Sequence, residues 1–273
     1  MRLLISDNSD VYKQDGYLKF DGFFTSKEIS DIKRAYSECI ESALEGVKII
    51  HEDDGITIRS IMGYHQQHPI LDRYTRDPRV LEVINGIIQS PVYVSQSKIN
   101  SKAPKNNNNV VGKKWLYHRD FSFWHILDGI PKPSMVSTFV YITEQTEENG
   151  AIYVLKGSHK DTSLDLIKAE VGFEKNGTGE RIGDTSEKLS LQIIPKMLEG
   201  YIQKYECVTL IGRPGDLIIM DPCLLHASND NNTNLSRDIM ITVYNPTNNL
   251  PKHPRQESFL CDPVHRAIKP WTA

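Results

Sequence analysis

From Val92 onward the sequence consists of short runs rich in Val, Ile, Tyr and Thr, and these runs restrict the possible folds more than any other feature. β-Branched and aromatic residues in short runs bounded by turn residues are typical of β-strands. The expected strands are Pro91 to Ile99, Val136 to Thr143, Ala151 to Leu155, Leu217 to Met220 and Ile239 to Tyr244. They predict a β-barrel or a β-sandwich.

The part of the chain before this change is expected to be mainly helical. Residues 9–24 read as a short helix and a strand, and Thr25 with Glu28 forms a capping box at the start of the next helix. A further helix is expected from Pro78 to Gln89. We therefore predict one domain over residues 1–273, with a helical part at about 1–90, a β-rich core at about 91–250 and an extended tail at 251–273.

Charge and cysteine usage narrow the class of protein. The formal net charge is -3 and no long block of one sign occurs, so we expect neither nucleic acid nor anionic lipid as a partner. No signal-peptide core or membrane-spanning run is visible, which predicts a cytoplasmic protein. We expect a small molecule as its partner and a monomer or homodimer as its oligomeric state. The four cysteines lack a Cys-x-x-Cys pairing, and we expect reduced thiols rather than a zinc or redox site at Cys39, Cys207, Cys223 and Cys261.

Two segments look like loops. Lys105 to Asn109 contains four consecutive asparagines and is expected to be an exposed insertion. Gly172 to Lys188 is rich in glycine and charge and long for a loop, so we expect either disorder or a mobile cover over a site.

Three residues have the pattern of a metal site. His118 and Asp120 are two positions apart, and on a strand their side chains would project to the same face. His226 lies in a later β-rich segment and could add a third ligand from a facing strand. Two histidines and one carboxylate leave three coordination positions open, which is the arrangement that non-haem Fe(II) oxygenases use.

An arginine downstream strengthens this interpretation. Arg237 lies eleven residues after His226, at the start of an apolar strand. Its planar guanidinium could pair with a carboxylate of a dicarboxylic acid through two parallel hydrogen bonds.

Longer motifs surround these residues and resemble one known family. The run from His118 to His125 reads HRDFSFWH, and it is followed by Asp128 to Pro131, Asn149 to Ala151, Gly157 to Lys160, His226 to Asn229 and Arg237. These motifs resemble the phytanoyl-CoA dioxygenase superfamily, and its ectoine hydroxylase branch in particular, over roughly Tyr12 to Leu250. The resemblance implies a mainly β fold with flanking helices around a double-stranded β-helix, or cupin-like jelly-roll, core. It also implies Fe(II), 2-oxoglutarate and O2, with release of succinate and CO2.

The resemblance also implies roles for individual residues. Arg237 would bind the distal carboxylate of 2-oxoglutarate, and Asn100, Ser137 and Trp124 would line its site. Gln96 and Lys98 would contact the substrate, together with Met220 and Ile241. The last two replace the phenylalanines that enclose the substrate in ectoine hydroxylases, and Lys98 replaces an arginine, which argues against ectoine itself.

The most specific function expected is therefore hydroxylation of an unactivated C–H bond in a small amino-acid-derived metabolite. Oxidative ring closure or desaturation, as in kainoid-forming relatives, is the main alternative at the same iron centre. Asp120 argues against halogenation, because related halogenases carry a small residue there. A cupin-like binding module and a zinc hydrolase are two competing hypotheses, and no positioned general base supports the hydrolase.

Overall fold

The computed structural model describes residues 3–41, 48–52, 54–105, 112–161, 166–168, 191–253 and 264–272. Its centre is a pair of antiparallel sheets. The larger sheet has seven strands in the order β1-β11-β6-β13-β4-β3-β2, and the smaller has four in the order β10-β7-β12-β5. Two facing antiparallel sheets with helices outside them form a double-stranded β-helix, as predicted.

The bounds of the elements follow the chain in order. The larger sheet contains β1 (Tyr17–Phe20), β2 (Lys48–His51), β3 (Ile58–Met62), β4 (Val92–Lys102), β6 (Val136–Tyr141), β11 (Leu217–Met220) and β13 (Arg237–Pro246). The smaller contains β5 (Trp115–His118), β7 (Ile152–Leu155), β10 (Cys207–Thr209) and β12 (His226–Ser228), and β8 (Leu166–Lys168) pairs with β9 (Leu191–Ile193). The helices are α1 (Leu3–Asp15), α2 (Ser26–Glu41), α3 (Tyr64–Gln67), α4 (Pro69–Thr75), α5 (Pro78–Ile88), α6 (Asp120–Asp128), α7 (Pro195–Lys204) and the 3-10 turn η1 (Ser158–Lys160).

The strands of the larger sheet are buried on both faces. On β11, Leu217 and Ile219 pack with the helices, whereas Ile218 and Met220 pack between the two sheets. Alternate side chains of a strand point to opposite faces, so an unbroken apolar run is what a sheet covered on both sides requires. The short apolar runs of the sequence therefore mark the centre of this sheet.

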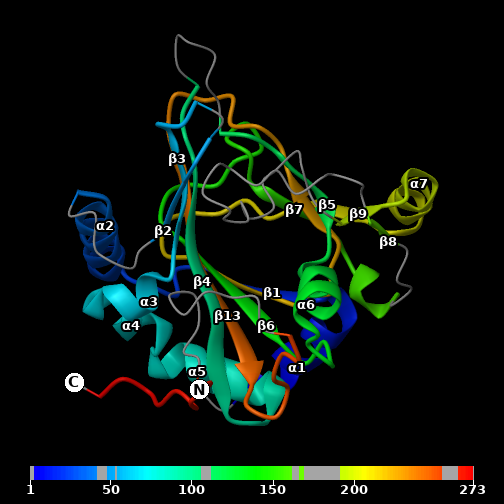
Figure 1. Ribbon diagram of the computed structural model, residues 1–273, viewed down its shortest axis with the longest axis horizontal. Coiled ribbons are helices and arrows are strands. Elements are labelled where there is room, and N and C mark those ends of the chain that lie inside the picture. Colours follow the sequence, from blue (N-terminus) through cyan, green and yellow to red (C-terminus); the bar gives the residue numbers. More distant parts are fainter. Residues whose placement is uncertain are drawn as a thin grey trace.

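Helices cover the outer face of the larger sheet. Figure 1 shows α2, α3 and α4 beside the long strands, and the smaller sheet with β5 and β7 on the other side. Helix α2 begins at the predicted capping box, where Thr25 N donates to Glu28 Oε2 at 2.7 Å and Glu28 N donates to Thr25 Oγ1 at 3.3 Å. Its buried stripe is Ile29, Ile32, Ala35 and Cys39. No helix within the described ranges is long and apolar enough to cross a bilayer.

The expected strands and helices are all present, with ends shifted by a few residues. The tail at 251–273 packs in part, since Ile268 N donates to Val92 O at 2.8 Å and Trp271 N to Arg76 O at 2.8 Å. The segments Gly172 to Lys188 and 106–109 lie outside the described residues. The elements that were not expected from the sequence include strands β2, β3, β8, β9 and β10 and helices α3, α4, α6 and α7.

Candidate metal centre and cavity

The two histidines of the predicted site lie directly opposite each other on neighbouring strands. His118 is the last residue of β5 and His226 is the first of β12, and the two are paired in the antiparallel register. Their ring centroids are 4.2 Å apart. Both side chains are buried. Pairing of two strands that are remote in sequence therefore forms half of the site.

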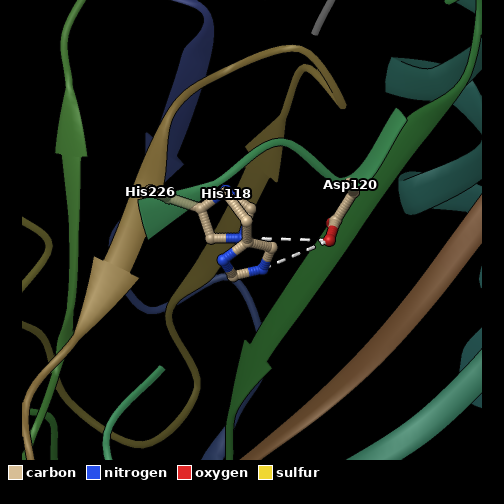
Figure 2. Close-up of side chains that lie close together, drawn as sticks. All are labelled: His118, Asp120 and His226. Carbon is tan, nitrogen blue, oxygen red and sulfur yellow. Dashed lines mark ion pairs between the residues drawn. The ribbon is translucent and has the colours of Figure 1, made fainter. Parts of the chain in front are cut away.

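Asp120 reaches the histidines in a different way from that predicted. The expectation that His118 and Asp120 share one strand face is wrong, because β5 ends at His118 and Asp120 is the first residue of α6. The extended backbone of Arg119 turns the chain from strand to helix, and Phe121 N donates to Pro222 O at 2.9 Å. Asp120 Oδ1 still lies 3.6 Å from His118 Nε2 and 3.9 Å from His226 Nε2 (Figure 2).

Backbone carbonyl groups fix which nitrogen of each imidazole faces Asp120. His118 Nδ1 lies 2.6 Å from Leu116 O, and His226 Nδ1 lies 2.9 Å from Leu224 O. A carbonyl oxygen can only accept, so each Nδ1 must carry the hydrogen. Each Nε2 then presents a lone pair, which is the tautomer that a metal-binding histidine needs.

Burial favours the neutral form of His118. Burial, with a further contribution from the neighbouring His226, lowers the pKa of His118 to about 3. For Asp120, burial acts to raise the pKa, but the neighbouring His226, His118 and Lys98 act to lower it and outweigh burial, so the pKa is lowered. A carboxylate beside neutral imidazoles is the donor set that Fe(II) oxygenases use.

Within the described part of the chain, this is the one cluster of three or more His, Cys, Asp or Glu side chains whose ligand atoms lie within 4.8 Å of one another. The thiols of Cys39, Cys207 and Cys223 are free, as expected, and Cys261 lies outside the described residues. The donor set therefore fits a single metal ion at the predicted residues.

The three side chains face a cavity between the two sheets. On its opposite wall, Gln96, Lys98 and Asn100 alternate along β4, and Arg237, Ile241 and Val243 lie along β13. The remaining lining residues are Trp115, Phe139, Ile152, Ala227 and Ser228. Five of the predicted ligand-contacting residues thus share one cavity with the metal site: Gln96, Lys98, Asn100, Arg237 and Ile241.

One end of the cavity is rich in hydrogen-bond donors. Arg237 is 2% exposed, and its Nη2 donates to Gly150 O at 3.0 Å. Its Nε has no hydrogen-bond partner among the described residues. Lys102 lies directly across from Arg237 in the β4–β13 register, and its Nζ donates to Ser228 Oγ at 2.8 Å. This end is suited to a negatively charged group.

Three predicted site residues lie outside the lining that the structure describes. Trp124 packs with the apolar side chains of α6, against Val243. Ser137 is fully buried on β6, where it pairs with Val243 and Met220, and its Oγ has no hydrogen-bond partner among the described residues. Met220 is fully buried in the cluster that contains Ile241. All three therefore support the cavity wall from behind.

Several residues around the cavity were not expected from the sequence. Trp115 lines it, and the guanidinium of Arg59 lies 4.4 Å from the centroid of its indole. Arg59 Nη1 donates to both carboxylate oxygens of Glu52 at 2.9 Å. Lys102 is another such residue. None of them belongs to a motif, and their positions relative to the metal site depend on strand register.

Comparisons with known proteins agree with this geometry. The family model described as "Phytanoyl-CoA dioxygenase (PhyH)" matches residues 12–239. An ectoine dioxygenase from Bordetella bronchiseptica is 28% identical to this chain, and the match covers 98% of this chain and 85% of the dioxygenase. An L-proline trans-4-hydroxylase from Streptomyces griseoviridis is 26% identical, and the match covers 91% of this chain and 89% of the hydroxylase.

A solved structure also matches nearly the whole chain. EctD from S. alaskensis with 2-oxoglutarate and 5-hydroxyectoine superimposes with a TM-score of 0.77 at 26% identity, over 96% of this chain and 85% of EctD. The same protein with bound Fe gives a TM-score of 0.78 at 25% identity. The family model covers well over half of the chain, and the fold and the site agree with it. This chain therefore belongs to the phytanoyl-CoA dioxygenase family.

Proposed function

We propose that this protein is an Fe(II)- and 2-oxoglutarate-dependent dioxygenase that hydroxylates a small amino-acid-derived metabolite. One observation carries the proposal. Two buried imidazoles that each direct Nε2 to the same carboxylate lie in one cavity with a buried arginine. Solved EctD structures with Fe and with 2-oxoglutarate support both cofactors.

His118, Asp120 and His226 would hold the iron from one face. Bound Fe(II), with 2-oxoglutarate as the electron donor and O2 as the oxidant, supplies oxidation of an unactivated C–H bond, with succinate and CO2 as products. The protein contributes ligation, orientation and exclusion of water. Burial of both histidines and the apolar walls around them keeps solvent away from the reacting atoms.

Arg237 would bind the distal carboxylate of 2-oxoglutarate, because its guanidinium is buried and its Nε lacks a partner among the described residues. Asn100 lines the same cavity, and its buried Oδ1 is also without a described partner. Ser137 and Trp124 would contribute from behind the lining, as the family resemblance implies. The co-substrate would thus be held at the donor-rich end.

The substrate would lie along Gln96, Lys98 and Ile241, with Met220 behind them. No hydrogen bond or ion pair is formed by the Lys98 ammonium within the described part of the chain, although this side chain lines the cavity. An ammonium in a partly apolar cavity favours an anionic group, so we infer that the substrate carries a carboxylate. The hydroxylases of proline and ectoine among the relatives support an amino-acid-derived substrate.

We further propose that residues 1–273 act as one domain, with the helical part, jelly-roll core and tail described above. Its partner would be a small molecule and not a nucleic acid or a membrane. We propose a cytoplasmic monomer or homodimer, in keeping with the modest net charge of -3.

The test is succinate release with Fe(II), 2-oxoglutarate and ascorbate, measured against a panel of amino acids and their derivatives. Gain of one oxygen atom in the product, detected by mass spectrometry, would support hydroxylation. Loss of two hydrogen atoms would instead support ring closure or desaturation. The Asp120→Ala variant is the matched inactive control. Absence of succinate above that control with every candidate would favour a binding module.

A further inference from the structure

Two buried basic side chains face each other at the donor-rich end of the cavity. Arg237 on β13 and Lys102 on β4 are direct partners in the antiparallel register. Lys102 is 0% exposed and Arg237 is 2% exposed. Like charges directly opposite each other on paired strands oppose folding, and burial makes the repulsion stronger.

The hydrogen-bond acceptors of the Lys102 amine are neutral groups. Its Nζ donates to Ser228 Oγ at 2.8 Å and also to Asn229 O. Within the described residues, no carboxylate lies within ion-pair distance of either Lys102 or Arg237. Ser228 also lines the cavity, so its hydroxyl connects Lys102 to any occupant. Because Ser228 Oγ accepts from Lys102, its own hydrogen can be donated to a carboxylate.

The charged groups around Lys102 do not compensate for its burial. The pKa of Lys102 is lowered to about 5, mainly by burial and then by the positive charges of Arg237 and Arg59. The carboxylates of Asp230 and Glu52 act to raise it. Glu52 is already bonded by Arg59, and Asp230 Oδ1 accepts from the backbone of Lys114. At neutral pH the amine is therefore uncharged when the cavity holds no anion.

We propose that binding of a dicarboxylate at this end of the cavity drives uptake of a proton by Lys102, so that co-substrate binding is coupled to pH. This inference rests on the proposed function, since it takes 2-oxoglutarate to be that dicarboxylate. A carboxylate bound by Arg237 and Ser228 places negative charge beside the amine, which favours its protonated form. Before binding, Arg237 supplies one positive charge at this end of the cavity. Protonation of Lys102 adds a second positive charge to balance the dicarboxylate.

The sign of the pH dependence follows from this coupling. The pKa of Lys102 is lower in the free protein than in the complex with 2-oxoglutarate. At any pH between these two values, the complex binds more protons than the free protein. The affinity for 2-oxoglutarate should therefore rise as the pH falls from the raised pKa to about 5, by at most about tenfold per pH unit. Both carboxyl groups of 2-oxoglutarate stay ionised over most of this range.

The experiment measures proton uptake directly. Protein loaded with Ni(II) in place of Fe(II), which prevents turnover, is titrated with 2-oxoglutarate by isothermal calorimetry at pH 6.5 in two different buffers. Both buffers must have a pKa near this pH and must not compete for the anion site, so PIPES and ACES, which differ widely in ionisation enthalpy, are used. We expect the apparent enthalpies in these two buffers to differ by an amount that corresponds to uptake of up to about one proton per bound molecule. In Lys102→Met this difference should nearly vanish, whereas Lys114→Met, which alters an exposed lysine nearby, should retain it.

The outcomes separate this inference from the proposed function. Equal enthalpies in the two buffers for the wild-type protein, or undiminished uptake in Lys102→Met, would overturn the role of Lys102 and leave the proposed function intact. No binding of 2-oxoglutarate at all would contradict the proposed function and this inference together. If Lys102→Met does not fold, the pH profile of the wild-type dissociation constant decides, because an affinity that is constant between pH 6 and pH 8 contradicts the coupling.

Discussion

Hydrogen bonds from His118 and His226 to two backbone carbonyl groups hold both imidazoles in the orientation for metal binding. Leu116 O and Leu224 O each bond the Nδ1 of the histidine two residues later in the sequence. These bonds orient the rings and leave each Nε2 free to bind a metal. Because outer bonds of this kind also raise the basicity of the ligand, they contribute to metal affinity. At the scale of single residues, Asp120 and Arg237 offer the sharpest tests of the site.

Asp120→Ala should abolish most turnover and weaken Fe(II) binding. The variant loses the anionic donor and retains two neutral imidazoles, so the defect should exceed the roughly ten- to hundredfold loss that is typical of outer-shell groups. Anaerobic Fe(II) titration and succinate release measure the two effects. Asp10→Ala removes an exposed carboxylate on α1 and serves as the control. Near wild-type succinate production by Asp120→Ala would refute the metal assignment.

Arg237→Lys should weaken 2-oxoglutarate binding while Fe(II) binding stays normal. Lysine keeps the positive charge but replaces a planar fork with a single ammonium, so one of two parallel hydrogen bonds is lost. Loss of a charge-assisted hydrogen bond costs about 1.5 to 3 kcal/mol, or roughly ten- to a hundredfold in affinity. Calorimetric titration of the metal-loaded protein measures this change.

Arg213→Lys, at an exposed position, is the matched control for that substitution. Unchanged affinity in Arg237→Lys would show that the anion is bound elsewhere in the cavity.

Single residues were predictable from sequence where they belong to a motif. His118, Asp120, His226 and Arg237 occur at characteristic spacings, and the structure places all four around one cavity. Lys102 belongs to no motif. Its relation to Arg237 arises from the pairing of β4 with β13, and strand register depends on contacts across the whole sheet.

At the scale of elements, the junction between β5 and α6 decides where Asp120 lies. An unbroken strand would place His118 and Asp120 on one face, and the sequence pattern favoured that geometry. The aromatic run after Asp120 instead forms α6, which buries Phe121 and Trp124 and ends at Asp128, with Gly129 as its C-cap at a φ of 71°. Local propensity is a weak guide for a short aromatic segment, because packing determines its conformation.

The capping box of α2 can be tested as an element. Thr25→Ala removes the side chain that accepts from Glu28 N and bonds Glu28 Oε2. Loss of a helix N-cap destabilises a protein by about 1 kcal/mol, within a range of roughly 0.5 to 2. Urea unfolding should show this decrease, whereas Ser30→Ala, on the exposed part of the same helix, should change stability by less than about 0.5 kcal/mol. Equal effects of the two substitutions would contradict a special role for the cap.

At the scale of the whole molecule, each sheet supplies a different part of the site. The smaller sheet carries the two histidines on β5 and β12, and the larger carries Lys98, Lys102 and Arg237 on β4 and β13. Burial between the sheets leaves Lys102 and Arg237 without carboxylate partners among the described residues. Such burial lowers the free energy of unfolding. We therefore expect the free energy of unfolding of the metal-free protein to depend on pH.

The sign of this dependence follows from Lys102. Its pKa is about 5 in the folded protein and 10.5 ordinarily, so between these values the unfolded chain binds one more proton. Stability must therefore increase with pH over this interval, by about 1.4 kcal/mol per pH unit for a full proton. Between pH 6 and pH 8 the contribution is about 2 to 3 kcal/mol. Asp221, whose pKa is raised to about 6, acts in the opposite direction near the lower end of that range.

Comparison of the wild-type protein with Lys102→Met isolates this contribution, since Asp221 and the other titrating groups are common to both. Urea unfolding of chelator-treated protein at pH 6 and pH 8 should show that wild-type stability increases more between these pH values than that of Lys102→Met, by about 2 to 3 kcal/mol. Lys114→Met should behave like the wild-type protein, because its amine is exposed in both the folded and the unfolded states. The same increase in Lys102→Met as in wild type would mean that Lys102 keeps its proton in the folded protein. An anion or water network would then have to stabilise the charged amine in the absence of co-substrate.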